Sequence, residues 1–172
     1  MKHGFLIGFM ATAAMATGGT AYAESLTDGQ VAEVLLDINS GEIDSARLAL
    51  KKSKNEDIKA FATAMEAQHK ENQSTSKKIL SLQKIDAKKS DLSKELKKLA
   101  KEENAMIKKA GGEFDKAYLA EQVKMHEKII KTLDENLMPS AKNLDLQAHL
   151  ASTRAAVAQH LDHAKELQKK FE

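Results

Sequence analysis

The chain has 172 residues, 30% of them charged, with Lys+Arg 27 against Asp+Glu 25 and with no cysteine or tryptophan. The lack of cysteine excludes a disulfide framework, a thiolate metal site, a cysteine nucleophile, c-type haem attachment and a lipidated N-terminal cysteine. A formal net charge of +2 is too small to indicate binding to nucleic acid or to an anionic membrane. The length fits one domain, and an apolar share of 42% is enough for a hydrophobic core.

Residues 1–23 have the pattern of an export signal. A short basic start precedes an apolar run from Phe5 to about Met15, and the segment closes on the small-x-small cleavage pattern Ala21-Tyr22-Ala23. The apolar run is too short for a membrane-spanning helix. The sequence therefore predicts a protein that is exported, periplasmic if the source is Gram-negative, and soluble, with residues 24–172 forming one helical domain.

The remaining residues are typical of helices almost throughout. They contain one proline and four glycines, and they are rich in Ala, Leu, Lys, Glu and Gln, which all favour helix. Gly111-Gly112 and Pro139 are the expected breaks. We expect helices over about 27–52, 57–82, 91–110, 113–137 and 140–171.

Four of these helices are long and are joined by short turns, which predicts an all-α, antiparallel four-helix bundle. The helix over 91–110 is shorter and lies between the second and third long helices. The pattern leaves its place open, either as a fifth member of the bundle or across one end.

Each long helix carries ionisable side chains on its apolar face. Glu42 lies on the first stripe, His69 on the second, His126 on the third and His160 on the fourth. Burying such a group costs several kcal/mol unless it is paired or bound to a metal ion. Four such positions therefore need an explanation.

Residue levels along the bundle predict two clusters. At about 1.5 Å of rise per residue, Glu42 and His69 lie about equally far from the turn that joins their helices, and His126 lies near the same level. His160 is expected roughly 10 Å from His126 along the axis. The predicted clusters are Glu42, His69 and His126, as candidate metal ligands, and Asp115, Tyr118 and His160, as a second buried polar cluster.

Two interpretations of these groups stay open. Imidazole and carboxylate together suit a divalent metal such as Zn, Fe or Cu. Alternatively, buried histidine–carboxylate pairs fix the register of the helices. A di-iron centre would need Glu-x-x-His on two helices, and only Glu66-x-x-His69 has that spacing, so a ferroxidase centre is disfavoured.

Four ordered motifs cover nearly all of residues 24–172. They are Asn39-Ser40-Gly41-Glu42-Ile43; Phe61-Ala62-x-x-Met65 leading to His69; Phe114-Asp115-x-x-Tyr118 with His126; and His160-Leu161-x-x-Ala164. Together they resemble a family of secreted bacterial proteins that is catalogued as a domain of unknown function and often labelled as outer membrane proteins. The resemblance implies a ferritin-like four-helix bundle and no established activity. Gln68 differs from that family, in which an acidic residue usually precedes the histidine.

The sequence favours a non-enzymatic, periplasmic helical bundle of unestablished function, with a metal ion between its helices as an open feature. A link to envelope stress is suggested by location and family alone. One alternative is a metal-dependent enzyme or metal store that uses the inward histidines and glutamate. Another is a chaperone-like or membrane-surface bundle that opens to expose its apolar faces. Nucleic-acid binding is not expected, because the lysine-rich stretch over 84–101 has no aromatic residue; a protein partner stays open.

Overall fold

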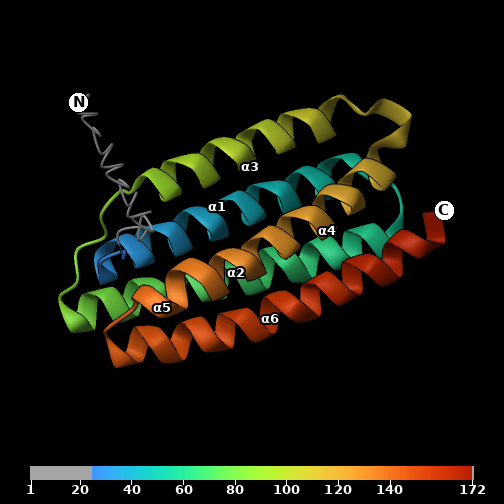
Figure 1. Cartoon of the computed structure of the whole chain (residues 1–172). Coiled ribbons are helices and arrows are strands. Elements are labelled where there is room, and N and C mark those ends of the chain that lie inside the picture. The colour runs from blue at the N-terminus through green and yellow to red at the C-terminus, as the bar shows by residue number, and fades with distance from the viewer. Residues whose placement is uncertain (1–24, 172) are drawn as a thin grey trace, which may run out of the picture.

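The computed structural model describes residues 25–171, and this part of the chain forms helices joined by short turns (Figure 1). The predicted all-α class is confirmed. The predicted export signal over residues 1–23 lies outside the described residues. The α-helices are α1 (Asp28–Lys52), α2 (Glu56–Gln83), α3 (Asp91–Lys109), α4 (Phe114–Thr132), α5 (Met138–Ser140) and α6 (Leu144–Gln168). Short 3-10 turns cover Gly111–Glu113 and Lys169–Phe171, and a π-helical turn covers Leu133–Leu137.

Polar N-cap residues set where most of these helices begin. At the start of α1 the side chain of Thr27 accepts from the backbone N–H of Gln30, and the side chain of Gln30 accepts from the backbone N–H of Thr27. Ser90 and Ser93 form the same reciprocal pair of bonds at the start of α3. Asn55 caps α2. Each cap satisfies backbone N–H groups that have no partner within the helix.

Helices α1, α2, α4 and α6 surround the core, and α3 lies along the outside (Figure 1). Helix α2 packs against both α1 and α6, and α4 packs against α6. Figure 1 shows α1 and α2 running in opposite directions, α4 and α6 likewise, and α2 and α4 running in the same direction. Helix α3 makes the return crossover between α2 and α4. It packs lengthwise on α1 and α4, and so it does not cross one end of the bundle.

Two apolar clusters fill the core, and polar residues lie between them. One cluster includes Ile38 of α1 and Val157 of α6, and the other includes Ala46 of α1 and Ala164 of α6. Between these positions α1 carries buried Asn39 and Glu42, and α6 carries buried His160. The polar layer is thus held in place by apolar packing on both sides.

The connection between α4 and α6 differs from the one that the sequence predicts. Pro139, the expected break, lies inside α5, which directly follows the π-helical turn Leu133–Leu137. The wider π turn accommodates a proline that cannot donate to the carbonyl four residues earlier. The chain leaves the helix at Ala141, and α6 begins at Leu144, where the side chain of Asn143 accepts from the N–H of Leu146 at 3.0 Å.

No helix in residues 25–171 combines the length and the apolar character that crossing a membrane requires.

Candidate metal centre

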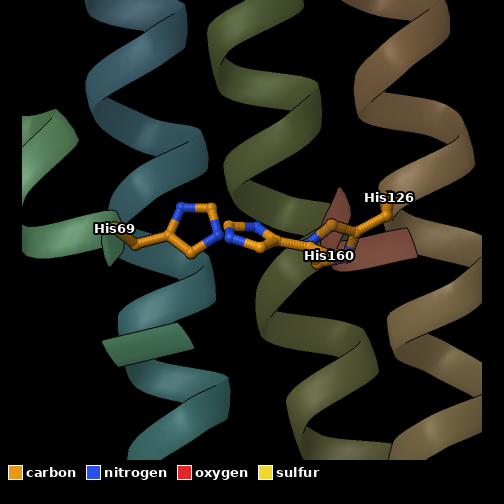
Figure 2. Close-up of side chains that lie close together, drawn as sticks. All are labelled: His69, His126 and His160. Carbon is orange, nitrogen blue, oxygen red and sulfur yellow. The ribbon is translucent and has the colours of Figure 1, made fainter. Parts of the chain in front are cut away.

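Three histidine rings meet in the polar layer of the bundle. His69 comes from α2, His126 from α4 and His160 from α6. One ring nitrogen from each lies within 4.8 Å of the other two. The ring centroids are 5.2–6.0 Å apart, and Figure 2 shows the rings pointing toward one another. The side chains are nearly enclosed, with 3%, 0% and 8% of their surface exposed in chain order.

Each ring uses its outer nitrogen in a hydrogen bond to a neutral oxygen. His126 Nδ1 lies 2.8 Å from the backbone carbonyl of Gln122, which only accepts, so this nitrogen carries the proton. His69 Nδ1 lies 2.9 Å from Asn39 Oδ1. His160 Nε2 contacts Gln68 Oε1.

The amide of Asn39 is fixed in the orientation that makes it an acceptor for His69. Its Nδ2 donates to the backbone carbonyl of Leu35 at 2.9 Å and to Asn72 Oδ1 at 2.7 Å. Asn72 in turn donates to Thr153 Oγ1 at 2.6 Å. This network runs from α1 through α2 to α6, and it sets both the tautomer and the orientation of His69.

The inner nitrogens of the triad have no hydrogen-bond partner. These are His69 Nε2, His126 Nε2 and His160 Nδ1, all fully buried. Because the outer nitrogen of each neutral ring carries the proton, each inner nitrogen presents a lone pair. Three acceptors cannot satisfy one another, and a buried acceptor without a partner costs about 1–3 kcal/mol. A cation at the centre would satisfy all three.

Burial keeps these rings uncharged. It lowers the pKa of His126 to about 4, and burial together with the neighbouring His126 and His163 lowers the pKa of His160 to about 4. The pKa of His69 falls well below its ordinary 6.5 through burial, with His126 and His160 adding to the shift. Neutral imidazole is the form that binds metal ions, so near pH 7 protons would not compete for the inner nitrogens.

A metal–imidazole bond is about 2.0–2.1 Å long, so three nitrogens in a trigonal arrangement around one ion lie about 3.5–3.6 Å apart. The observed limit of 4.8 Å is about 1 Å wider. The rings would have to move inward for all three nitrogens to bind one ion.

Glu42 lies outside this triad, in the next layer of the bundle. Its Oε2 accepts from Gln122 Nε2 at 3.3 Å, and Gln122 is also the residue whose carbonyl holds His126. Burial raises the pKa of Glu42 to about 7, against the lowering effect of the Gln122 hydrogen bond. Glu42 is therefore linked to the triad through one residue and does not join the group of three ring nitrogens.

The second expected cluster is also arranged differently. The structure places His160 with His69 and His126, and not with Asp115 and Tyr118. The ring of Tyr118 packs against those of Phe61 and Phe114, each with its centroid 6.2 Å away. Its hydroxyl and Asp115 Oδ1 are buried without a hydrogen-bond partner.

The positions of the turns explain both differences. His69 is 13 residues from the start of α2, and the residue equally far from the end of α1 is Asn39, with Glu42 one turn nearer the connection. Counted from Ser140 and Leu144, which bound the true α4–α6 connection, His126 and His160 lie 14 and 16 residues away. Counting from Pro139 places His160 too far along the axis.

The sequence pattern did not predict two of the hydrogen-bond acceptors of the triad. These are the backbone carbonyl of Gln122, which faces His126, and the side-chain oxygen of Gln68, which faces His160. Neither residue type marks a metal site by itself, and only the packed helices show which amide oxygen faces which ring. The N-cap pattern of Asn143 followed by Leu144 and Asp145 is a signal that would have placed the start of α6 correctly. Glu66, the acid of the Glu-x-x-His spacing, binds Arg47 at 2.8 Å and Lys70 at 2.7 Å instead.

A family model described as "Domain of unknown function (DUF4142)" matches residues 11–167. No curated protein and no solved structure matches the sequence significantly.

Proposed function

This chain belongs to the DUF4142 family of unknown function, and we propose that it holds a transition-metal ion between His69, His126 and His160. The observation that carries the proposal is the convergence of three buried ring nitrogens with no hydrogen-bond partner. Three neutral imidazoles suit late first-row metals such as zinc and copper. The outward hydrogen bonds to Asn39, Gln122 and Gln68 are the outer contacts that orient metal-binding histidines.

The burial of the triad supports holding an ion over catalysis on a substrate. His126 is fully enclosed and the other two rings are nearly so. An ion bound there would be surrounded by protein on most sides. A catalytic metal ion keeps an open position that a substrate reaches from solvent, and the enclosed rings argue against such access.

The export of this protein and a ferritin-like fold are part of the same proposal. The pattern of residues 1–23 supports cleavage after Ala23 and a periplasmic location. A bundle with one long crossover between its second and third main helices has the connection found in ferritin-like folds, and α3 makes such a crossover. Mass analysis of the chain recovered from whole cells tests the export: a first residue at Glu24 supports it, and an intact Met1 contradicts it.

The metal proposal is tested by elemental analysis of tag-free protein, before and after loading with Zn, Cu or Fe. We expect about one ion per chain in the wild type, and its loss in His69→Ala and His126→Ala. His163→Ala is the matched control, because His163 is an exposed histidine of α6 outside the triad. Circular dichroism checks that each variant is folded. A wild type that takes up no ion, or triad variants that keep it, would sink the proposal.

A further inference from the structure

The triad carries no negative charge, either in the rings or in the groups behind them. Each acceptor of an outer ring N–H is a neutral amide oxygen: the side chain of Asn39, the backbone carbonyl of Gln122 and the side chain of Gln68. Many zinc-bound histidines instead donate to a carboxylate, which strengthens them as ligands for a divalent ion. Here the surroundings of the ion would contribute only dipoles.

Two carboxyl groups near this layer, those of Glu42 and Glu66, are not available to balance a charge at the centre. Glu42 is tied to Gln122 Nε2, and burial raises its pKa to about 7, so near neutral pH it is protonated in much of the population. Glu66 is held at the surface by Arg47 and Lys70. Among the described residues, no fourth histidine and no carboxylate joins the group of three nitrogens.

The charge of the ion then decides which metal is favoured. The cost of moving an ion from water into a low-dielectric interior grows with the square of its charge, so a divalent ion costs about four times as much as a monovalent ion of similar size. Three neutral ligands offset less of that cost than a ligand set with an anionic member would. A monovalent ion is the better match to three buried, neutral imidazoles.

Coordination number leads to the same conclusion. Zinc bound by three histidines takes a fourth ligand, usually water, and the near-complete burial of His69, His126 and His160 restricts the access of such a ligand from solvent. Copper(I), a d¹⁰ ion, is stable with three ligands, and imidazole is a suitable donor for copper.

We propose that the His69–His126–His160 site is selective for monovalent copper, Cu(I), over divalent zinc. This inference rests on the proposed function, because it names the ion that the same site takes. It also identifies Gln68 as a residue that sets the selectivity, since its uncharged oxygen faces His160 Nε2.

The test compares the two metals on the full chain. Affinity for Cu(I) is measured without oxygen, in ascorbate, by competition with a colorimetric Cu(I) chelator. Affinity for Zn²⁺ is measured by competition with a fluorescent zinc chelator. We expect Cu(I) to bind at least ~100-fold more tightly than Zn²⁺, since the divalent ion bears the larger burial cost without a compensating anion.

The variant Gln68→Glu tests whether the lack of negative charge behind the triad sets the preference for Cu(I). This substitution preserves the shape and the acceptor oxygen of an exposed side chain and adds a negative charge behind His160. It should strengthen Zn²⁺ binding by about tenfold, within the range found for outer-shell partners of metal ligands, and so narrow the preference for Cu(I). Gln73→Glu is the matched control, because it adds the same charge to α2 at a position that contacts Lys77.

The outcomes separate the two proposals. Zinc bound as tightly as Cu(I) in the wild type overturns the selectivity and leaves the metal site standing. Failure of both ions to bind overturns the site itself. If Gln68→Glu strengthens zinc binding no more than Gln73→Glu does, the lack of negative charge behind the triad is not what sets the preference.

Discussion

His69 and His126 turn Nε2 toward the centre of the triad, whereas His160 turns Nδ1. The difference follows from which nitrogen of each ring has an outer partner. On α4 the partner is the carbonyl one turn back along the same helix, a bond of 2.8 Å, so the helix itself fixes the tautomer of His126. On α2 and α6 the partners come from side chains, Asn39 and Gln68. The three outer hydrogen-bond partners differ, but each ring is neutral and directs a nitrogen lone pair toward the centre of the triad.

A first prediction concerns the stability of the metal-free protein in acid. The folded pKa of His126 is about 4, below the ordinary 6.5, so the unfolded chain binds the extra proton in the window between these values. Stability therefore falls as the pH drops from about 6.5 toward 4, by about 2.5 kcal/mol for this ring at pH 4.5.

His126→Gln should escape this loss. Its stability relative to wild type should rise by about 2 kcal/mol between pH 7 and pH 4.5, measured by urea unfolding without metal. Comparing the two proteins at each pH cancels the opposite contribution of Glu42. A difference that does not change with pH would mean that His126 is not held neutral by burial.

A second prediction concerns Glu42, whose pKa is raised to about 7. A raised carboxyl pKa means that the folded state disfavours the charged form, so stability falls as the pH rises from about 4.5 through 7 and stays lower above that range. Glu42→Gln removes the charge and keeps an acceptor for Gln122. Its stability relative to wild type should be about 2 kcal/mol more favourable at pH 8 than at pH 5.

The groups that face Glu42 from the neighbouring helices are Glu103 of α3 and Tyr118 of α4. Glu103 titrates in the same pH range, because burial raises its pKa to about 7 against the lowering effect of Lys124, and Glu42 adds to the rise. Removing the Glu42 charge relieves this repulsion too, so Glu103 adds to the expected gain of Glu42→Gln at pH 8. Burial and Glu42 raise the pKa of Tyr118 further above its usual range. Urea unfolding at both pH values measures the difference. A Glu42→Gln variant less stable than wild type at pH 8 would contradict the assignment.

At the scale of elements, the close contact of α3 with α1 depends on one glycine. A Cβ built on Gly41 would lie 2.8 Å from Cβ of Ala100, which is too short for two packed carbons and cannot be relieved by rotating a side chain. This approach keeps α3 on the seam between α1 and α4, where it covers Glu42 and Gln122 from outside.

Gly41→Ala should therefore destabilise the protein by about 1–3 kcal/mol, the usual cost of overpacking a well-packed contact, although alanine favours helix. Adding Ala100→Gly to the same chain frees the space and should restore most of the loss. Gly112→Ala serves as a control, since a Cβ there meets nothing within 4 Å. Thermal unfolding compares the variants; equal destabilisation of the single and double variants would exclude the proposed steric cause.

At the scale of the whole molecule, composition and periodicity were sufficient to predict an all-α chain with four long helices and a shorter one between the second and third. The path of that shorter helix was not predictable, because an apolar stripe shows that one face is covered but not which groove of the bundle covers it. Its buried Leu96 and Ile107 belong to such a stripe, but which seam it covers depends on the direction of α4.

The polar residues that face the core were recognisable from sequence, while their grouping was not. Levels in a bundle depend on where each turn lies, and one misplaced turn moved His160 by about a helical turn or more relative to His126. Asn39 illustrates the other limit: an amide on an apolar face indicates a buried hydrogen bond, but its partner on α2 appears only when α1 and α2 are packed together.

The central claim is that one metal ion binds to three imidazole nitrogens inside this bundle. X-ray absorption spectroscopy on the metal-loaded, tag-free wild type tests it most directly. The predicted result is a first shell with three nitrogens at about 2.0 Å and outer scattering from three imidazole rings. In His160→Ala we expect fewer first-shell nitrogens and weaker imidazole scattering. A shell dominated by oxygen, without imidazole scattering, would contradict the account.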